Sequence, residues 1–343
     1  MKNQHLFWIL ALVLSLSVAA EHPTYGPFET LKTLAPGADI EGMAIDNKGH
    51  LWLVDRSAAT VTEYDAEGKR LRVLVQPGQQ KGAVQTPIAL SISPDSKRVA
   101  VADGEALLRL YSAETGEWIR NLLTLKYCAP FGFFLSQTRI VYVGRGFKEL
   151  PAVPPFLAPT VFSTDLEGKD LRVEREEQVT SETHPSFFLL AQGFAVPLPE
   201  NRWAVCRGLP RELYIINGEG KILKEARAAG SPPHWSPAIF KNGEEQDKAL
   251  YSTSHPVGIF YTKGLIGVLW QDPPSQKEQF HIEWVDQELH PAGNSPLQLP
   301  EKLGPKDYIR GAATDKEGNL YLLVVSRARV LPGESFLFRA AMK

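Results

Sequence analysis

The sequence predicts an all-β fold, a six-bladed β-propeller in which an N-terminal strand closes the last blade. Three observations support this prediction. A unit of two short apolar strands joined by a polar turn recurs six times, at intervals of about 43 to 63 residues, as expected for propeller blades with loop insertions. A second hairpin pattern follows most copies of this unit. No segment after residue 20 shows the sustained apolar period of a helical repeat.

The recurring unit begins with an apolar strand, turns at polar residues, and ends with an apolar strand that runs into a charged residue. The first copy leads from Gly42 through a turn at Asn47-Lys48-Gly49 to Asp55. We expect each copy to form the two inner strands of one blade. The six copies span residues 42–55, 88–103, 131–145, 194–207, 257–272 and 311–325.

The segments between these units predict the outer strands. Their hairpin turns contain glycines such as Gly68 and Gly220, which supply the positive φ that a tight turn requires. The chain finishes with Ser335 to Arg339, which would be the third strand of the sixth blade. We expect Pro27 to Leu34 to add the missing fourth strand, because pairing the two chain ends buries two sheet edges. A two-domain β-sandwich fits the strand content but not six copies of one unit.

Residues 1–20 have the layout of a secretory signal peptide. Lys2 precedes a short apolar run from Leu6 to Ser17, and Val18-Ala19-Ala20 offers small residues before a cleavage site at Glu21. The run is too short to span a bilayer, and no later segment is long and apolar enough to do so. The prediction is therefore a secreted or periplasmic protein with one propeller domain over residues 21–343 and no membrane span after signal removal.

Composition excludes some classes of partner. The net charge is −2, so neither nucleic acid nor an anionic membrane surface is expected as a partner. The two cysteines, Cys128 and Cys206, are a candidate disulfide in an oxidising compartment, and two buried thiols are the alternative. Their spacing does not suggest a zinc site.

Charged residues stand where function is expected in a propeller. First strands begin, and second strands end, at one face of the ring, so their terminal residues surround one end of the central axis. This predicts a charged ligand-binding face, with a solvated rim as the alternative. The candidate residues are Glu41, Asp55, Arg56, Asp103, Arg145, Arg207, His255, Asp272 and Arg310.

The stretch from Ile40 to Leu74, IEGMAIDNKGHLWLVDRSAATVTEYDAEGKRLRVL, resembles an NHL-type repeat. The resemblance is partial over 88–123 and 311–338. It implies the superfamily of NHL-repeat, TolB-like and SMP-30-like six-bladed propellers, a fold that hosts many activities. Glu41-Gly42 also resembles the opening Glu-Gly of lactonase-like members, which hold a divalent cation at the channel mouth. The Asn ligands of that group are missing here, which leaves Asp103 and Asp272 as possible acid ligands.

Other features leave metal binding as an alternative. His184, His234 and His255 precede or open the fourth and fifth units, and imidazoles together with Glu41 would suit a divalent metal. Each of these histidines adjoins a proline, which is also typical of an extended loop. The main expectation is no cofactor. The alternative is a divalent cation such as calcium, with Glu41, Asp103 and His255 as its candidate ligands.

Two functional hypotheses follow. The first is a monomeric binding or scaffold protein that recognises a protein, peptide or glycan through the charged face. Long inserts at 146–160 and 229–254 would contribute to recognition. The second is a metal-dependent, lactonase-like hydrolase at the channel mouth. The sequence does not decide whether the chain is an enzyme.

Overall fold

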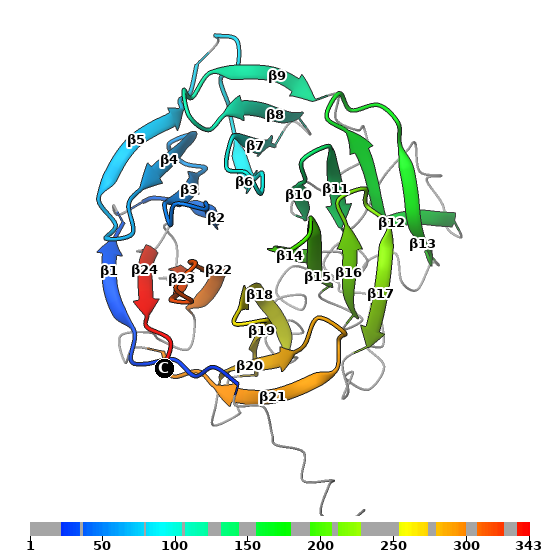
Figure 1. Cartoon of the computed structure of the whole chain (residues 1–343). Coiled ribbons are helices and arrows are strands. Elements are labelled where there is room, and N and C mark those ends of the chain that lie inside the picture. Colours follow the sequence, from blue (N-terminus) through cyan, green and yellow to red (C-terminus); the bar gives the residue numbers. More distant parts are fainter. Residues whose placement is uncertain are drawn as a thin grey trace, which may run out of the picture.

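The computed structural model is a ring of six four-stranded antiparallel sheets, which confirms the six-bladed β-propeller (Figure 1). It describes residues 22–34, 37–78, 80–104, 107–122, 132–143, 156–179, 193–207, 212–227, 254–273, 279–299, 307–325 and 335–343. Within these ranges the regular elements are strands, without helices. None of the described residues belongs to a helix with the length and apolar character needed to cross a membrane.

The first three blades follow one another along the chain, each with its strands in sequence order from the axis outward. Their bounds are β2 (Ile40–Ile45), β3 (Leu51–Asp55), β4 (Thr60–Tyr64) and β5 (Arg70–Val75) in blade 1; β6 (Pro87–Ile92), β7 (Arg98–Asp103), β8 (Leu107–Ser112) and β9 (Trp118–Leu122) in blade 2; and β10 (Phe133–Leu135), β11 (Arg139–Val143), β12 (Phe156–Asp165) and β13 (Arg172–Val179) in blade 3.

Blades 4 and 5 repeat this order, and blade 6 contains both ends of the chain. Their bounds are β14 (Gly193–Leu198), β15 (Arg202–Arg207), β16 (Glu212–Asn217) and β17 (Ile222–Arg227) in blade 4; β18 (His255–Thr262), β19 (Leu265–Gln271), β20 (Phe280–Val285) and β21 (Pro291–Pro296) in blade 5; and β22 (Tyr308–Thr314), β23 (Leu320–Val325), β24 (Ser335–Ala340) and β1 (Glu29–Thr33) in blade 6.

An acidic or amide side chain shapes most of the hairpin turns. In the turn after β4, Asp65 Oδ1 accepts hydrogen bonds from the backbone N–H groups of Glu67 and Lys69. Asp165, Asn217 and Asp286 make the same two bonds in their own turns. A glycine with positive φ, such as Gly68, follows in several of these turns. This local chemistry explains why the turn pattern predicts the strand ends well.

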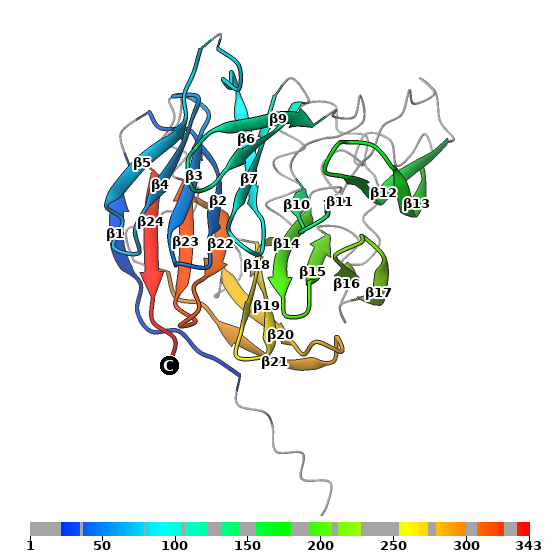
Figure 2. The same ribbon diagram turned by 45° about the horizontal axis from the view of Figure 1, so that its top comes forward.

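The N-terminal strand closes the ring as the sequence predicts. β1 lies beside β24 (Figure 2) and pairs with it in an antiparallel register that sets Glu29 opposite Arg339. The side chains of these two residues form an ion pair. The residues before β1 continue along the neighbouring blade. There the Tyr25 ring packs against Phe260 and Trp284 of blade 5, at centroid separations of 6.1 and 6.4 Å. The N-terminal segment therefore ties blades 5 and 6 together.

Small residues allow the inner strands to converge on the axis. A Cβ atom added at Gly258 of β18 would lie 2.6 Å from Ala312 Cβ of β22. Gly42 of β2 lies against Ala89 of β6 in the same way, although with more space. Apolar side chains from neighbouring blades fill the spaces between the sheets, as where Trp52 and Val54 of blade 1 pack with Tyr111 of blade 2.

Blade 3 differs from the sequence-based expectation. Residues 146–160 were expected to form a loop insert, but Phe156 to Thr160 belong to β12, and Phe156 to Pro159 pair with β13. Leu157 in this part of β12 is 60% exposed. The remainder of that insert, and all of the 229–254 insert except Ser254, lie outside the described residues.

Candidate functional site

The candidate site is the end of the ring where the inner strands begin and the second strands end, which we call the mouth face. The strand register places the predicted residues there: Ile40, beside Glu41, pairs with Asp55, Pro87 with Asp103, and Gly193 with Arg207. His255 pairs with Gln271, which precedes Asp272. Arg310 lies near the start of β22. Arg145 lies outside the described residues.

Asp103 is buried in blade 2 rather than displayed on the mouth face. Its side chain is fully buried and accepts hydrogen bonds from the backbone N–H groups of Gln85 and Thr86, at 3.1 and 2.8 Å. The Arg109 guanidinium of β8 lies 3.1 Å away. Burial opposes the ionised form, but these bonds outweigh it and hold the pKa of Asp103 below its ordinary value. Asp103 therefore ties the loop before β6 to β7 and β8.

We predict that acid weakens the fold partly through Asp103. Because its pKa is lower in the folded than in the unfolded chain, its contribution is present above the unfolded value of about 3.9. That contribution is lost as the pH falls through the folded-state pKa. Asp103→Asn should be less stable than wild type near neutral pH, and the difference should shrink below about pH 4. Urea unfolding across this range measures it, and a difference independent of pH would contradict the assignment.

Arg207 is also buried, at 1% side-chain exposure, and forms an ion pair with Glu212 at 3.1 Å. The other oxygen of Glu212 lies 3.2 Å from Arg175 of blade 3, and the Tyr214 hydroxyl donates a hydrogen bond to the carboxylate. Burial is the main reason that the pKa of Tyr214 is raised, which keeps this hydroxyl protonated as a donor. These four side chains join blades 3 and 4 and present little of Arg207 to a ligand.

Asp272 and Asp55 are held within their own blades too. Asp272 is 7% exposed, and its carboxylate lies 2.5 Å from His281 Nδ1 of β20. Asp55 accepts hydrogen bonds from Ser57 Oγ at 2.7 Å and from the backbone N–H of Ala58 at 3.0 Å, so it shapes the turn after β3. His255 is half-buried at the start of β18.

Glu41, Arg56 and Arg310 do come together, at the junction of blades 1 and 6. Arg56 Nη1 lies 3.2 Å from one oxygen of Glu41, and Arg310 Nη2 contacts the other oxygen. Arg56 Nη2 also lies 2.7 Å from Asp39. The side chain of Glu41 is 5% exposed, whereas those of Arg56 and Arg310 are 48% and 30% exposed. The Glu41 carboxylate is therefore buried, and the side chains of Arg56 and Arg310 that cover it are partly exposed to solvent.

Bulges in the inner strands explain how this group assembles. Four inner strands have a register shift at the same place, between Ile40 and Gly42 in β2 and between Ile309 and Gly311 in β22, for example. A β-bulge inserts one extra residue and redirects its side chain. Glu41 and Arg310 are those extra residues in adjacent blades. The corresponding residues of blades 2 and 5, Ile88 and Val257, are apolar and buried.

This geometry does not suit a divalent cation at Glu41. Both carboxylate oxygens already contact guanidinium groups, which would repel a second cation. Asp103, a second candidate ligand, is fully buried and held by Arg109. The candidate ligands of a divalent cation, Glu41, Asp103 and His255, therefore lack an accessible pair of carboxylates. His184 and His234 lie outside the described residues.

Sequence reasoning missed two members of the mouth face. Asp39 precedes β2 and holds Arg56 in place, and the ring of Tyr308 lies 5.8 Å from the Arg310 guanidinium carbon. The alternation of Tyr308 and Arg310 on β22 was the available signal for the second. Cys206 is buried in β15. The disulfide between Cys128 and Cys206 stays a prediction, because Cys128 lies outside the described residues.

Comparisons with known proteins agree on the fold. No family model and no curated protein sequence matches this chain. Among solved structures, a member of the DUF4221 family from Bacteroides vulgatus is similar over 94% of this chain and 97% of its own, with a TM-score of 0.58 and 16% identity. The WD40 repeats of RRP9 are similar over 94% of this chain and 100% of their own, with a TM-score of 0.52 and 10% identity. U3-55K covers 93% of this chain and 100% of its own, with a TM-score of 0.50 and 11% identity. At such identities these likenesses show a β-propeller fold alone, and the NHL-type resemblance stays a prediction.

Proposed function

We propose that this protein is an exported binding protein that receives an acidic peptide on the mouth face, at Arg56 and Arg310. One observation carries the proposal. The acids at the strand ends, Asp55, Asp103 and Asp272, are engaged within their own blades, whereas these two arginines remain partly exposed. In the part of the ring that the structure describes, the predicted charged face thus offers two partly exposed arginines as donors, each already paired with Glu41 or Asp39.

The chemistry of the arginine side chain fits a carboxylate ligand. A guanidinium group presents five N–H donors in a planar fork and binds carboxylates in a bidentate manner. Arg56 uses Nη1 for Glu41 and Nη2 for Asp39, which fixes its plane before a ligand arrives. Preorganisation of this kind lowers the entropy lost on binding. The neighbouring Tyr308 ring offers an apolar surface beside the charge.

Export is part of this proposal and rests on the signal-like sequence of residues 1–20. An extracytoplasmic propeller with a preformed mouth face is a suitable receptor for peptides outside the cytoplasm. The lactonase-like hydrolase gains no support from the geometry around Glu41.

We predict that a labelled octaglutamate peptide binds the purified protein more tightly than octalysine does. Arg56→Ala should weaken octaglutamate binding by about tenfold, since a charge-assisted hydrogen bond contributes about 1.5–3 kcal/mol. Fluorescence anisotropy at low and high salt measures the affinities, and salt should weaken the binding.

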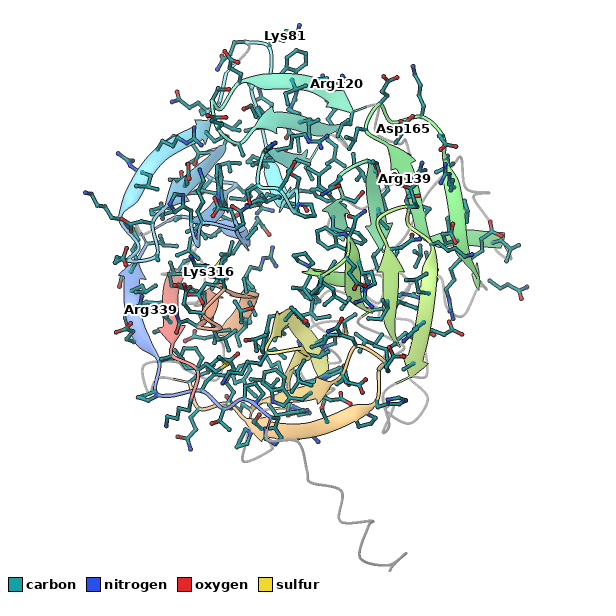
Figure 3. All side chains as sticks on the ribbon, in the orientation of Figure 1. Lys81, Arg120, Arg139, Asp165, Lys316 and Arg339 are labelled. Atoms are coloured by element: carbon teal, nitrogen blue, oxygen red, sulfur yellow. The ribbon has the colours of Figure 1, made fainter. Side chains whose placement is uncertain are left out.

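Arg120→Ala is the matched control. Arg120 on the outer strand β9 is 47% exposed and lies 3.8 Å from Glu167, so its loss removes an equally exposed arginine away from the mouth face (Figure 3). Its affinity for octaglutamate should equal that of wild type. Equal losses in the two variants, or a preference for octalysine, would overturn the proposed function.

A further inference from the structure

A second polar cluster lies at the end of blade 1 opposite the mouth face. The turn between β2 and β3 begins at Asp46 and ends at His50. Asp46 Oδ1 accepts hydrogen bonds from the backbone N–H groups of Lys48 and His50, at 2.8 and 2.9 Å. These bonds hold the carboxylate against the turn, and they leave Oδ2 directed toward the imidazole, 3.7 Å from His50 Nδ1.

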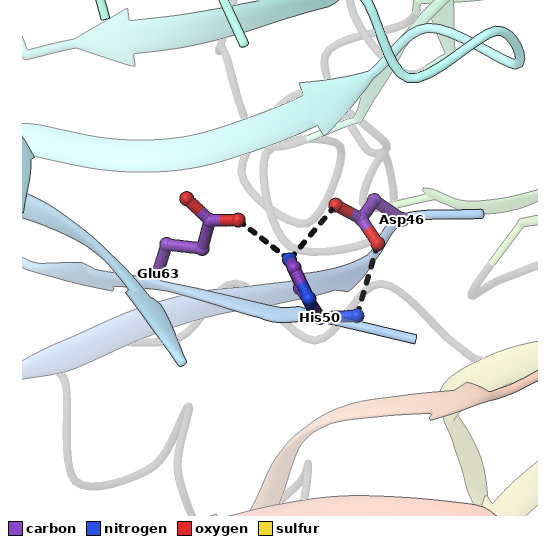
Figure 4. Close-up of side chains that lie close together, drawn as sticks. All are labelled: Asp46, His50 and Glu63. Atoms are coloured by element: carbon purple, nitrogen blue, oxygen red, sulfur yellow. Dashed lines mark hydrogen bonds and ion pairs between the residues drawn. The ribbon is translucent and has the colours of Figure 1, made fainter. Parts of the chain in front are cut away.

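Glu63 of β4 completes the cluster (Figure 4). Its Oε1 lies 2.7 Å from His50 Nδ1, on the other side of the same ring nitrogen from Asp46 (Figure 4). Among the residues that the structure describes, these three side chains are the one group of three potential metal ligands whose donor atoms converge, within 4.8 Å of one another. Two carboxylate oxygens and one imidazole nitrogen are a donor set that zinc accepts.

Neighbouring side chains fix the orientation of both carboxylates. Trp52 Nε1 donates a hydrogen bond to Asp46 Oδ2 at 3.2 Å. Arg72 Nε lies 2.5 Å from Glu63 Oε2, the oxygen that does not face His50. Arg72 is itself held by the backbone carbonyls of Ala113 and Glu114 in blade 2. Such outer partners are what orient the ligands of a metal site.

We propose that Asp46, His50 and Glu63 form a zinc-binding site with an open fourth position. Two ligands at about 2.1 Å from a tetrahedral ion lie about 3.4 Å apart, and the two nitrogen–oxygen distances here, 2.7 and 3.7 Å, fall on either side of that value. The carboxylates are 5% and 8% exposed, and His50 is 28% exposed, which gives an ion an entry path.

Charge distinguishes this cluster from Glu41 on the mouth face. Two carboxylates and one guanidinium leave a net charge of about −1 around His50, whereas Asp39, Glu41, Arg56 and Arg310 sum to about zero. A divalent cation is therefore favoured near His50 and not near Glu41.

A similar turn in blade 5 supplies an internal comparison. Asp286 accepts the same pair of backbone N–H bonds, from Glu288 and His290, and its Oδ2 lies 3.2 Å from His290 Nδ1. The structure brings no third ligand to that pair among the described residues. Asp286 and His290 are 41% and 75% exposed. This pair should not retain zinc.

Zinc titration of the metal-depleted full-length protein tests the proposal. Isothermal titration calorimetry with zinc chloride should find one site per chain. His50→Ala should weaken binding by about a hundredfold or more, because loss of an outer partner alone costs about 10–100-fold and this variant removes one of three ligands. Glu63→Gln should also weaken binding strongly. His290→Ala should bind as wild type does. Cobalt loading offers a second readout, since visible absorption bands of a tetrahedral site should be lost in His50→Ala.

Each other outcome is decisive. If wild type binds no zinc, or if His50→Ala binds it as wild type does, the proposal is wrong, and the second case identifies adventitious zinc only. His50 lies in a half-exposed turn, so its alanine variant keeps the test valid even if Glu63→Gln fails to fold; circular dichroism checks both. The zinc site lies at the other end of β2 and β3 from the mouth face. A negative result for zinc would therefore leave the proposed peptide binding unaffected.

Discussion

Deleting residues 22–34 should lower the free energy of unfolding by at least about 2 kcal/mol. The deletion removes β1, the partner of β24, and the buried Leu34. It also removes Tyr25, whose ring packs against Phe260 and Trp284 of blade 5. Burying one leucine side chain is worth about 1.5–3 kcal/mol, and an aromatic pair adds about 0.5–1.5 kcal/mol. Thermal and urea unfolding of the truncated protein measure the loss.

A synthetic peptide of residues 22–34 should restore part of that stability in trans. Strand addition to the exposed edge of β24 would rebuild blade 6, and the melting temperature should rise with peptide concentration. A peptide of the same composition in scrambled order is the control, and it should have no effect. A truncated protein as stable as wild type would show that ring closure by the N-terminal strand does not contribute to the free energy of unfolding.

Arg207→Ala should destabilise the protein by about 3–5 kcal/mol, the usual effect of removing one partner of a buried ion pair. Glu212 is 3% exposed, and the variant would remove its ion pair with Arg207 while the ion pair with Arg175 remains. Arg175 is itself shared with Glu225 at 2.6 Å, so its compensation is incomplete. Urea unfolding with tryptophan fluorescence measures the effect.

Arg172→Ala is the control for Arg207→Ala. Arg172 also forms ion pairs, with Asp170 and Glu219, but its side chain is 45% exposed. Solvent screening keeps such surface pairs at about 0–1 kcal/mol. A loss in Arg207→Ala no larger than that of Arg172→Ala would mean that the buried network of blades 3 and 4 adds little to the fold.

The sequence predicted the architecture because its signals are local. Turn residues such as Asp65 and Gly68 act on backbone groups within four positions, so they mark strand ends without tertiary knowledge. The extension of β12 was not predictable in this way. Residues 156–159 pair with β13, and Pro159 within them argues against a strand. A cross-strand partner overrides the local signal there.

The candidate site was predicted by position but not by exposure. Glu41, Arg56 and Arg310 lie together as strand-end reasoning suggests. Whether a strand-end charge reaches solvent depends on the third strand of its blade, which carries Arg109 as the ion-pair partner of Asp103 and Glu212 as that of Arg207. An opposite charge five or six positions later was the sequence signal for burial. The bulges that bring Glu41 and Arg310 into contact leave no comparable mark in the sequence.

Hydrogen exchange with mass spectrometry, with and without octaglutamate, tests the central claim that the mouth face binds acidic peptides. We expect slower exchange in peptides containing residues 39–42, 56–58 and 307–311, the segments around Asp39, Glu41, Arg56 and Arg310. The turns at the opposite end, around Asp46 and Asp315, should exchange unchanged. Protection of those turns, or of the outer strands alone, with no change at the mouth face would contradict the account.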